Sequence, residues 1–286
     1  MNNITNHIGV NEVGLLSKLA TMPLQQVWAE LRSRGVASVE MCTGFAGTER
    51  ARRSGDEIEY AYTGGKGGGL TRGEQIYPRI ESARQAGLDV VSMHLMFCEA
   101  YPEYIRESLP YLLEIHKHGV EQFVVSCSFS SAAMVEEYLP HLEYAARELK
   151  SAGAVLCYHN HHQDSEPLEN GKTAMEMVLK APDLMLQLDT GWAWYGGMDA
   201  PAFMKTHGDK IVSLHLKDLT ADARERQDIG RFTAIGSGAV NTVECLKSMD
   251  TCRLKQDRLI LDQDASAGDI FDDITDGIQF VRANTL

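Results

Sequence analysis

The sequence predicts a single closed (β/α)8 barrel, and three observations lead to that fold class. Short apolar runs alternate with longer amphipathic stretches over nearly all of the 286 residues, which is typical of βαβ units around a parallel sheet. Eight such units in about 250 residues match the size of a closed barrel. No GxGxxG loop follows the first predicted strand, and an open dinucleotide-binding sheet would carry one there.

Each predicted strand is a short run of apolar residues, many of them β-branched. In chain order the predicted strands are 8–13, 37–41, 89–94, 122–126, 155–159, 184–189, 211–216 and 259–262. Helices are predicted where apolar residues recur at helical spacing and where Gly or Pro marks an end. These segments are 23–34, 71–86, 102–118, 132–151, 171–180, 200–207, 241–248 and 270–283.

No linker interrupts this alternation, so we expect one barrel over residues 1–286. The long segment 43–70 ends in TGGKGGG at positions 63–69, and we expect it to be flexible. It is not a phosphate-binding Walker loop, because Gly67 rather than Ser or Thr follows Lys66. Two roles stay open for it, a mobile lid at the catalytic face or a plain surface loop.

Composition limits the partners and the compartment. The chain has 27 basic and 40 acidic residues and a net charge of −13, which disfavours nucleic acid as a partner. No window approaches the roughly 20 apolar residues of a membrane span, and the first residues lack the pattern of a signal peptide. None of the six cysteines forms a CxxC pair. We expect a cytoplasmic protein that acts on a small molecule.

Polar side chains with useful chemistry stand at nearly every predicted strand end, where a barrel carries its functional residues. They are Glu40, His94, His159, His161, Asp189, His215, Lys217, Asp262 and Asp264. Only the fourth strand ends without such a group, in Ser126, Cys127 and Ser128. A lone residue of this kind is usually a cap or a surface group. A ring of imidazoles and carboxylates is what Mn²⁺, Zn²⁺, Fe²⁺ or Co²⁺ needs, and it suits Ca²⁺ poorly.

Several motifs in this order carry a family resemblance. They are CYHNHHQDSE (157–166), LDTGWAW (188–194), HLKD (215–218), GSG (236–238) and LDQD (261–264). Together they resemble the sugar phosphate isomerase/epimerase family, whose fold is the xylose isomerase-like barrel. The resemblance implies one divalent metal ion, with Mn²⁺ favoured. Asp189 and His215 match the family's ligands, whereas Asp262 and either His159 or His161 stand where the family has glutamates.

The resemblance also implies an activity, the removal of a proton next to the carbonyl of a ketose or sugar phosphate. The family's two proton-transferring glutamates are absent, so His159, His161 and Asp262 are the candidate catalytic groups. The candidate substrate-binding residues are Glu40, His94, Trp192, Lys217 and Arg231. Lys217 and Arg231, with the glycines of 236–238, are the groups expected to hold a phosphate.

Two other functions compete with an isomerase or epimerase. The missing glutamate pair is compatible with a dehydratase or lyase on a keto-sugar or keto-inositol, such as an inosose, because such an enzyme needs the same enolisation. It is also compatible with a sugar-binding barrel that has lost catalysis. Barrels of this kind often form homodimers, and the sequence carries no readable interface.

Overall fold

The computed structural model describes residues 7–44, 71–96, 98–226 and 228–285. The predicted flexible loop lies mostly outside the described residues, since only Thr43 and Gly44 of it precede the gap and they belong to a strand.

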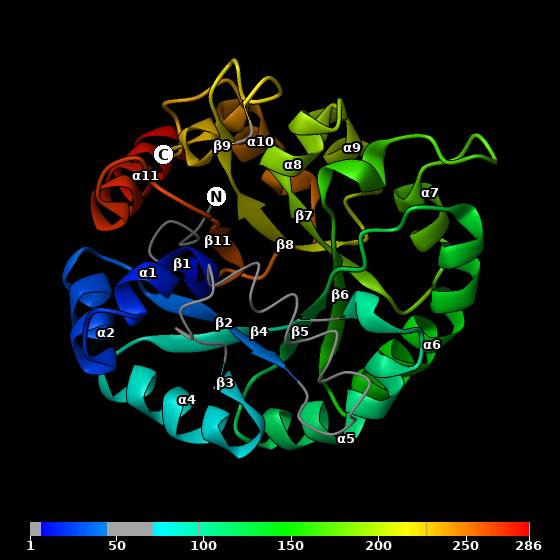
Figure 1. Ribbon diagram of the computed structural model, residues 1–286, viewed down its shortest axis with the longest axis horizontal. Helices are drawn as coiled ribbons and strands as arrows, with labels where there is room; N and C mark the ends of the chain where they lie inside the picture. Colours follow the sequence, from blue (N-terminus) through cyan, green and yellow to red (C-terminus); the bar gives the residue numbers. More distant parts are fainter. Residues whose placement is uncertain (1–6, 45–70, 97, 227, 286) are drawn as a thin grey trace.

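Eight parallel strands form a closed barrel, which confirms the predicted fold class (Figure 1). The first strand pairs with both the second and the last, and these two pairings close the sheet. The barrel strands are β1 (Ile8–Asn11), β2 (Ser38–Gly44), β4 (Asp89–Leu95), β5 (Gln122–Val125), β6 (Val155–His159), β7 (Met185–Asp189), β8 (Ile211–Leu216) and β11 (Leu259–Leu261).

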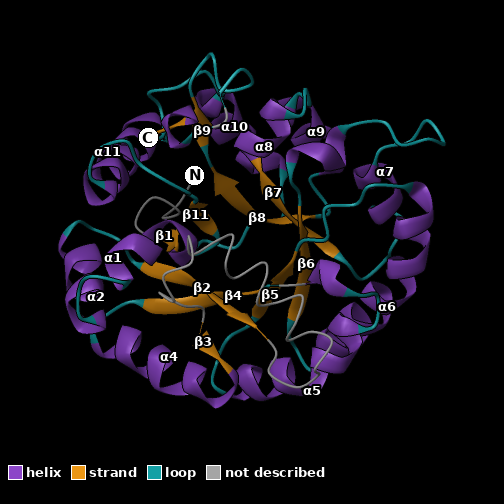
Figure 2. Cartoon of the chain, in the orientation of Figure 1, coloured by secondary structure: helices purple, strands orange, loops and turns teal. Residues whose placement is uncertain are grey.

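Helices surround the barrel and bury their apolar faces against it (Figure 2). The main ones are α2 (Leu24–Ser33), α4 (Ile76–Gln85), α5 (Tyr104–Lys117), α6 (Ala132–Ser151), α7 (Ala174–Val178), α9 (Ala200–His207), α10 (Thr242–Ser248) and α11 (Ile270–Asn284). No helix in the described part of the chain combines the length and the apolar character that a membrane crossing requires.

The structure differs from the sequence prediction at three places near the strand ends. The predicted helix 71–86 begins only at α4, because Thr71–Arg72 forms a short strand, β3, beside the end of β2. The sequence prediction also missed α8 (Thr190–Tyr195), which starts directly after β7, and the hairpin of β9 (Asp218–Leu219) with β10 (Phe232–Thr233). The other short elements are α1 (Leu16–Leu19) and the 3₁₀ turns η2 (Glu12–Leu15), η3 (Gly73–Gln75), η4 (Cys98–Ala100), η5 (His162–Ser165), η6 (Ile229–Arg231) and η7 (Met249–Thr251).

The centre of the barrel holds a polar layer rather than a purely aliphatic one. Glu40 accepts hydrogen bonds from Ser92 and Gln187 at 2.6 Å each. Gln122 donates to Ser92 at 3.1 Å, and Gln187 also donates to Ser213 at 3.3 Å. All five side chains are at most 1% exposed. Burying polar groups is tolerated when they bond one another, so this layer is a rigid platform directly beneath the strand ends.

Candidate active site

A cavity of about 510 Å³ opens among the carboxyl ends of the barrel strands. Residues from most strands contribute to its wall, as expected for a barrel enzyme. The predicted site residues that line it are His94, His159, His161, Trp192, Lys217, Arg231 and Asp262.

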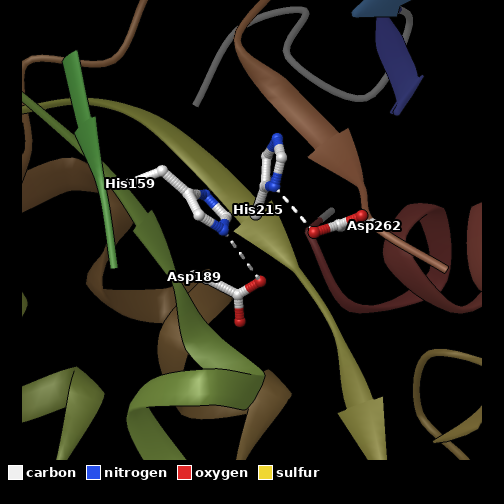
Figure 3. A group of neighbouring side chains, drawn as sticks. All are labelled: His159, Asp189, His215 and Asp262. Atoms are coloured by element: carbon white, nitrogen blue, oxygen red, sulfur yellow. Dashed lines mark hydrogen bonds and ion pairs between the residues drawn. The ribbon is translucent and has the colours of Figure 1, made fainter. Parts of the chain in front are cut away.

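Four of the predicted metal ligands come together in one buried cluster (Figure 3). They are His159 on β6, Asp189 on β7, His215 on β8 and Asp262 just after β11. Each offers one ligand atom, and these atoms lie within 4.8 Å of one another. His159 Nε2 lies 4.0 Å from Asp189 Oδ2, and His215 Nδ1 lies 2.9 Å from Asp262 Oδ2. We call these residues the four-residue cluster.

The donor chemistry of the cluster fits a divalent ion. Asp189 Oδ1 accepts a hydrogen bond of 2.6 Å from the Trp192 amide and so caps α8. Its other oxygen, Oδ2, is buried and accepts no hydrogen bond within the described structure. Burying an unsatisfied carboxylate oxygen is costly, and a cation held between two nitrogens and two carboxylates would satisfy it.

The electrostatics around the cluster also favour a cation. The carboxylates of Asp189, Asp262 and Asp264 lie within 3.5 Å of the ammonium group of Lys217, and the buried carboxylate of Glu40 lies 2.9 Å from His215. Burial raises the pKa of Asp189 to about 7, although the charge of Lys217 opposes that rise. For Asp262, burial alone would raise the pKa, but the charges of Lys217 and His215 hold it well below its usual value. Even with the positive charges of Lys217 and His215, the carboxylates leave an excess of negative charge around the cluster.

Lys217 forms ion pairs with three of these carboxylates. Its Nζ lies 2.6 Å from Asp264, 3.0 Å from Asp262 and 3.5 Å from Asp189. Burial alone would lower the pKa of Lys217, but these three carboxylates raise it above its usual value. The ammonium also lies 4.7 Å from the centre of the Trp192 ring. Lys217 therefore lines the cavity as a permanent positive charge.

The two histidines of the cluster differ in their partners. His215 lies between two carboxylates, with Nε2 2.9 Å from Glu40 and Nδ1 2.9 Å from Asp262. Burial alone would lower the pKa of His215, but Glu40 and Asp262 raise it to about 10. His159 faces the amide oxygen of Gln187 at 3.1 Å through Nδ1, and burial lowers its pKa well below the usual value.

His161 lies outside the four-residue cluster, in the wall of the cavity. Its ring centre is 5.2 Å from that of His159, and its Nδ1 lies 3.4 Å from Ser128 Oγ. Asp164 accepts a hydrogen bond of 2.8 Å from the His161 amide and one of 2.9 Å from the buried Tyr158 hydroxyl. Burial, and next the charge of Lys217, lower the pKa of His161 to about 3, so the imidazole is neutral at neutral pH.

Glu40 does not have the position expected of a substrate-binding residue. It is fully buried on β2 and is not among the residues that line the cavity. The reason is the direction of its side chain, which points into the polar layer of the barrel rather than toward the mouth.

The glycines of 236–238 also differ from expectation, since the amides of Gly236 and Gly238 donate to Asp218 at 2.8 and 3.0 Å. Those amides are therefore hydrogen-bonded to the Asp218 side chain and not free to bind a phosphate.

The sequence prediction missed two serines at the end of the fourth strand. Ser126 Oγ lies 3.4 Å from His94 Nε2, and Ser128 lies against His161. Both serines line the cavity. Ser128 has a φ of 46°, a left-handed conformation that is costly for a residue other than glycine and that often marks functional sites. No signal in the sequence distinguishes these serines from ordinary loop residues.

Comparisons with known proteins agree with this fold. The family model described as xylose isomerase-like TIM barrel matches residues 80–282. An inosose dehydratase of Geobacillus kaustophilus is 34% identical over 121 residues, which are 38% of this chain and 39% of that protein. The match therefore spans well under half the length of this curated relative.

Solved structures resemble the chain over nearly its whole length. A sugar phosphate isomerase/epimerase from Parabacteroides distasonis superposes with a TM-score of 0.69 at 20% identity, covering 97% of this chain and 94% of that one. The IolI protein, whose structure contains a zinc atom, superposes with a TM-score of 0.63 at 15% identity, covering 98% and 96%. The family model covers well over half of the sequence, and the chain therefore belongs to the xylose isomerase-like TIM barrel family.

Proposed function

We propose that this protein is a divalent-metal-dependent enzyme that removes a proton from the carbon next to the carbonyl of a ketose or sugar phosphate, and so isomerises or epimerises it. The observation that carries the proposal is the four-residue cluster with its unsatisfied Asp189 oxygen, two members of which, His159 and Asp262, line the cavity in the barrel mouth. The similarity to a sugar phosphate isomerase/epimerase supports the reaction class.

The four-residue cluster would hold the ion. His159 and His215 supply nitrogen donors, and Asp189 and Asp262 supply oxygen donors. A bound divalent ion polarises a substrate carbonyl and makes the adjacent C–H more acidic. Mn²⁺ is our first candidate, and Zn²⁺, which the IolI structure contains, is the second.

His161 is our candidate for the residue that moves the proton. It is neutral, it lines the cavity beside the cluster, and it is not among the four ligands. The other two candidates from the sequence already have partners. His159 is hydrogen-bonded to Gln187, and Asp262 contacts both His215 and Lys217. We therefore assign His159 and Asp262 to metal binding and His161 to proton transfer.

The cavity wall offers groups for a polyhydroxy substrate. Trp192 is 7% exposed there and presents an aromatic surface on which the C–H face of a sugar packs well. Arg231 lies 5.4 Å from the Trp192 ring and 5.0 Å from the Phe232 ring, and its Nε has no hydrogen-bond partner in the described structure. We assign Arg231 and His94 to substrate oxygens, including those of a phosphate.

The test is turnover of a panel of ketoses and ketose phosphates in D₂O by the metal-loaded protein. We expect an isomeric product that carries solvent deuterium next to the carbonyl. His161→Asn should retain the metal and lose about 10²–10⁴-fold in rate, which is the usual contribution of a general base. His207→Asn on α9 is the matched control and should keep full activity. Sugar binding without deuterium exchange would instead indicate an inactive sugar-binding barrel.

A dehydratase acting on a keto-sugar or keto-inositol is the second candidate. The specific observation in its favour is the curated inosose dehydratase, which shares 34% identity over 121 residues. The first step, removal of a proton next to the carbonyl, is the same, but a hydroxyl group then leaves as water. A product lighter than its substrate by one water, seen by mass spectrometry in the same panel, would favour this candidate over an isomerase.

A further inference from the structure

Glu40 is a fully buried carboxylate directly beneath the four-residue cluster. It comes from β2, on the opposite side of the sheet order from β7 and β8. The cavity does not reach it, so its role must act through other side chains.

Both oxygens of Glu40 are held by donors from several strands of the barrel, some of them across the barrel from β2. Oε2 accepts hydrogen bonds of 2.6 Å from Ser92 and from Gln187. Oε1 accepts one of 2.7 Å from Asn11 and lies 2.9 Å from His215 Nε2. Because Asn11, Ser92 and Gln187 donate to its two oxygens, the carboxylate has one orientation and each of these three side chains must present a hydrogen atom to it.

This arrangement determines which nitrogen of His215 faces the cluster. With Nε2 directed at Glu40, the opposite ring nitrogen Nδ1 lies 2.9 Å from Asp262 Oδ2, inside the cluster. Within the described structure Nε2 makes no hydrogen bond, whereas Nδ1 is hydrogen-bonded to the Asp262 carboxylate, so the contact with Glu40 fixes the orientation of the ring and not its tautomer.

The same carboxylate acts on His159 through Gln187. The Gln187 amide nitrogen donates to Glu40, so the amide oxygen is the atom that faces His159 Nδ1 at 3.1 Å. Nδ1 must then carry a hydrogen, which leaves the lone pair of His159 on Nε2, the nitrogen on the Asp189 side.

We propose that Glu40 is a positioning residue for both histidine ligands: it orients the His215 ring so that Nδ1 faces the cluster, and it sets the tautomer of His159 through Gln187. The proposal rests on the metal-dependent function given above. Partners of this kind fix the orientation of metal-binding histidines, and their loss typically weakens metal binding about 10–100-fold. Glutamine cannot replace Glu40 here, because its NH₂ group would face a donor at either end of the side chain.

The experiment compares the affinity for Zn²⁺ of Glu40→Gln and Glu12→Gln, measured by competition with a chelator and without substrate. Glu12 is the matched control, since it is another buried carboxylate that accepts from the Cys42 amide and from Arg79. We expect Glu40→Gln to bind Zn²⁺ about 10–100-fold more weakly and Glu12→Gln to bind it like the wild type. Equal affinity of the two variants would overturn the proposal.

A second measurement uses only the wild type, and it tests the role of Glu40 even if Glu40→Gln fails to fold. In ¹⁵N-histidine spectra of the Zn²⁺-loaded wild type, we expect His215 to bind zinc through Nδ1 and His159 through Nε2. The reverse assignment for either ring would overturn the role of Glu40 while leaving the metal function intact. A wild type that binds no divalent ion would overturn both proposals.

Discussion

Within the described structure, Lys217 and a protonated His215 are the only cationic groups among the carboxylates of the four-residue cluster. Removal of the Lys217 ammonium therefore tests how these charges balance. In Lys217→Met the side chain stays unbranched, becomes one heavy atom shorter and loses its charge. Asp262 and Asp264 lose close partners at 3.0 and 2.6 Å, and Asp189 loses one at 3.5 Å. All three carboxylates then repel one another in a buried site.

The size of the effect follows from these distances. Each contact is worth about 5–6 kcal/mol of Coulomb energy at an effective dielectric constant near 20, but burial of the charges offsets most of it. Removal of one partner from a buried ion pair costs about 3–5 kcal/mol. For a domain of 286 residues that corresponds to a fall in Tm of about 5–8 °C.

The assay is thermal and denaturant unfolding in EDTA and again with saturating Mn²⁺ or Zn²⁺. We expect the loss of stability in Lys217→Met to be clearly smaller with the ion, because a divalent cation neutralises the same carboxylates. By linkage, the variant then binds the ion more tightly than the wild type does.

The matched control is Lys247→Met, which removes an exposed lysine paired with Glu244 at 2.7 Å. Surface pairs contribute about 0–1 kcal/mol, so this variant should unfold like the wild type with or without the ion. A Lys217→Met protein that loses the same stability with and without metal, or that loses less than the control, would refute this account of the electrostatics.

The remaining predictions concern the cluster and its surroundings. Asp189→Asn retains the cap on α8 but loses its charged ligand oxygen, so metal content measured after dialysis should fall to background while the far-ultraviolet circular dichroism stays unchanged. Ser128→Gly relieves about 1 kcal/mol of backbone strain yet removes the hydroxyl beside His161, so denaturant unfolding should show equal or higher stability with a lower kcat. Arg79→Met leaves the carboxylate of Glu12 buried without its partner and should cost about 3–5 kcal/mol, with unchanged affinity for Zn²⁺ in a chelator titration.

Most of the barrel could be predicted from local patterns. Strands β6 and β8 and helices α6 and α9 have the bounds that the sequence predicts. Their signals are local, since apolar runs mark the strands and periodic apolar faces mark the helices. The failures lie where tertiary contacts override such signals.

The elements that the sequence prediction missed depend on tertiary contacts. Thr71–Arg72 is a strand because it pairs with the end of β2, 28 residues earlier at Thr43. α8 is only six residues long, and it forms because Asp189 caps its first turn while Trp192 packs beside β9 and β10 in a small apolar cluster. Neither the pairing of Thr71–Arg72 with β2 nor the packing of Trp192 against β9 and β10 can be predicted from the sequence of the segment itself.

The candidate site was partly predictable for a similar reason. In a barrel, polar residues at strand ends converge on one face, so the strand pattern alone groups His159, Asp189, His215 and Asp262 together. The sequence left His159 and His161 as alternatives for the metal, and only the geometry separates the first, inside the cluster, from the second, in the cavity wall.

The sequence by itself determined the fold class, the strand ends and a set of imidazoles and carboxylates there, because those features depend on the spacing of residues along the chain. Only the tertiary structure decided that Glu40 is buried, that Lys217 is held by three carboxylates, and that Gln187 turns its amide oxygen to His159. Glu40 and Gln187 are 147 residues apart and meet across the barrel. Contacts of this kind depend on how the closed sheet aligns its strands and directs each side chain, and no local pattern encodes that alignment.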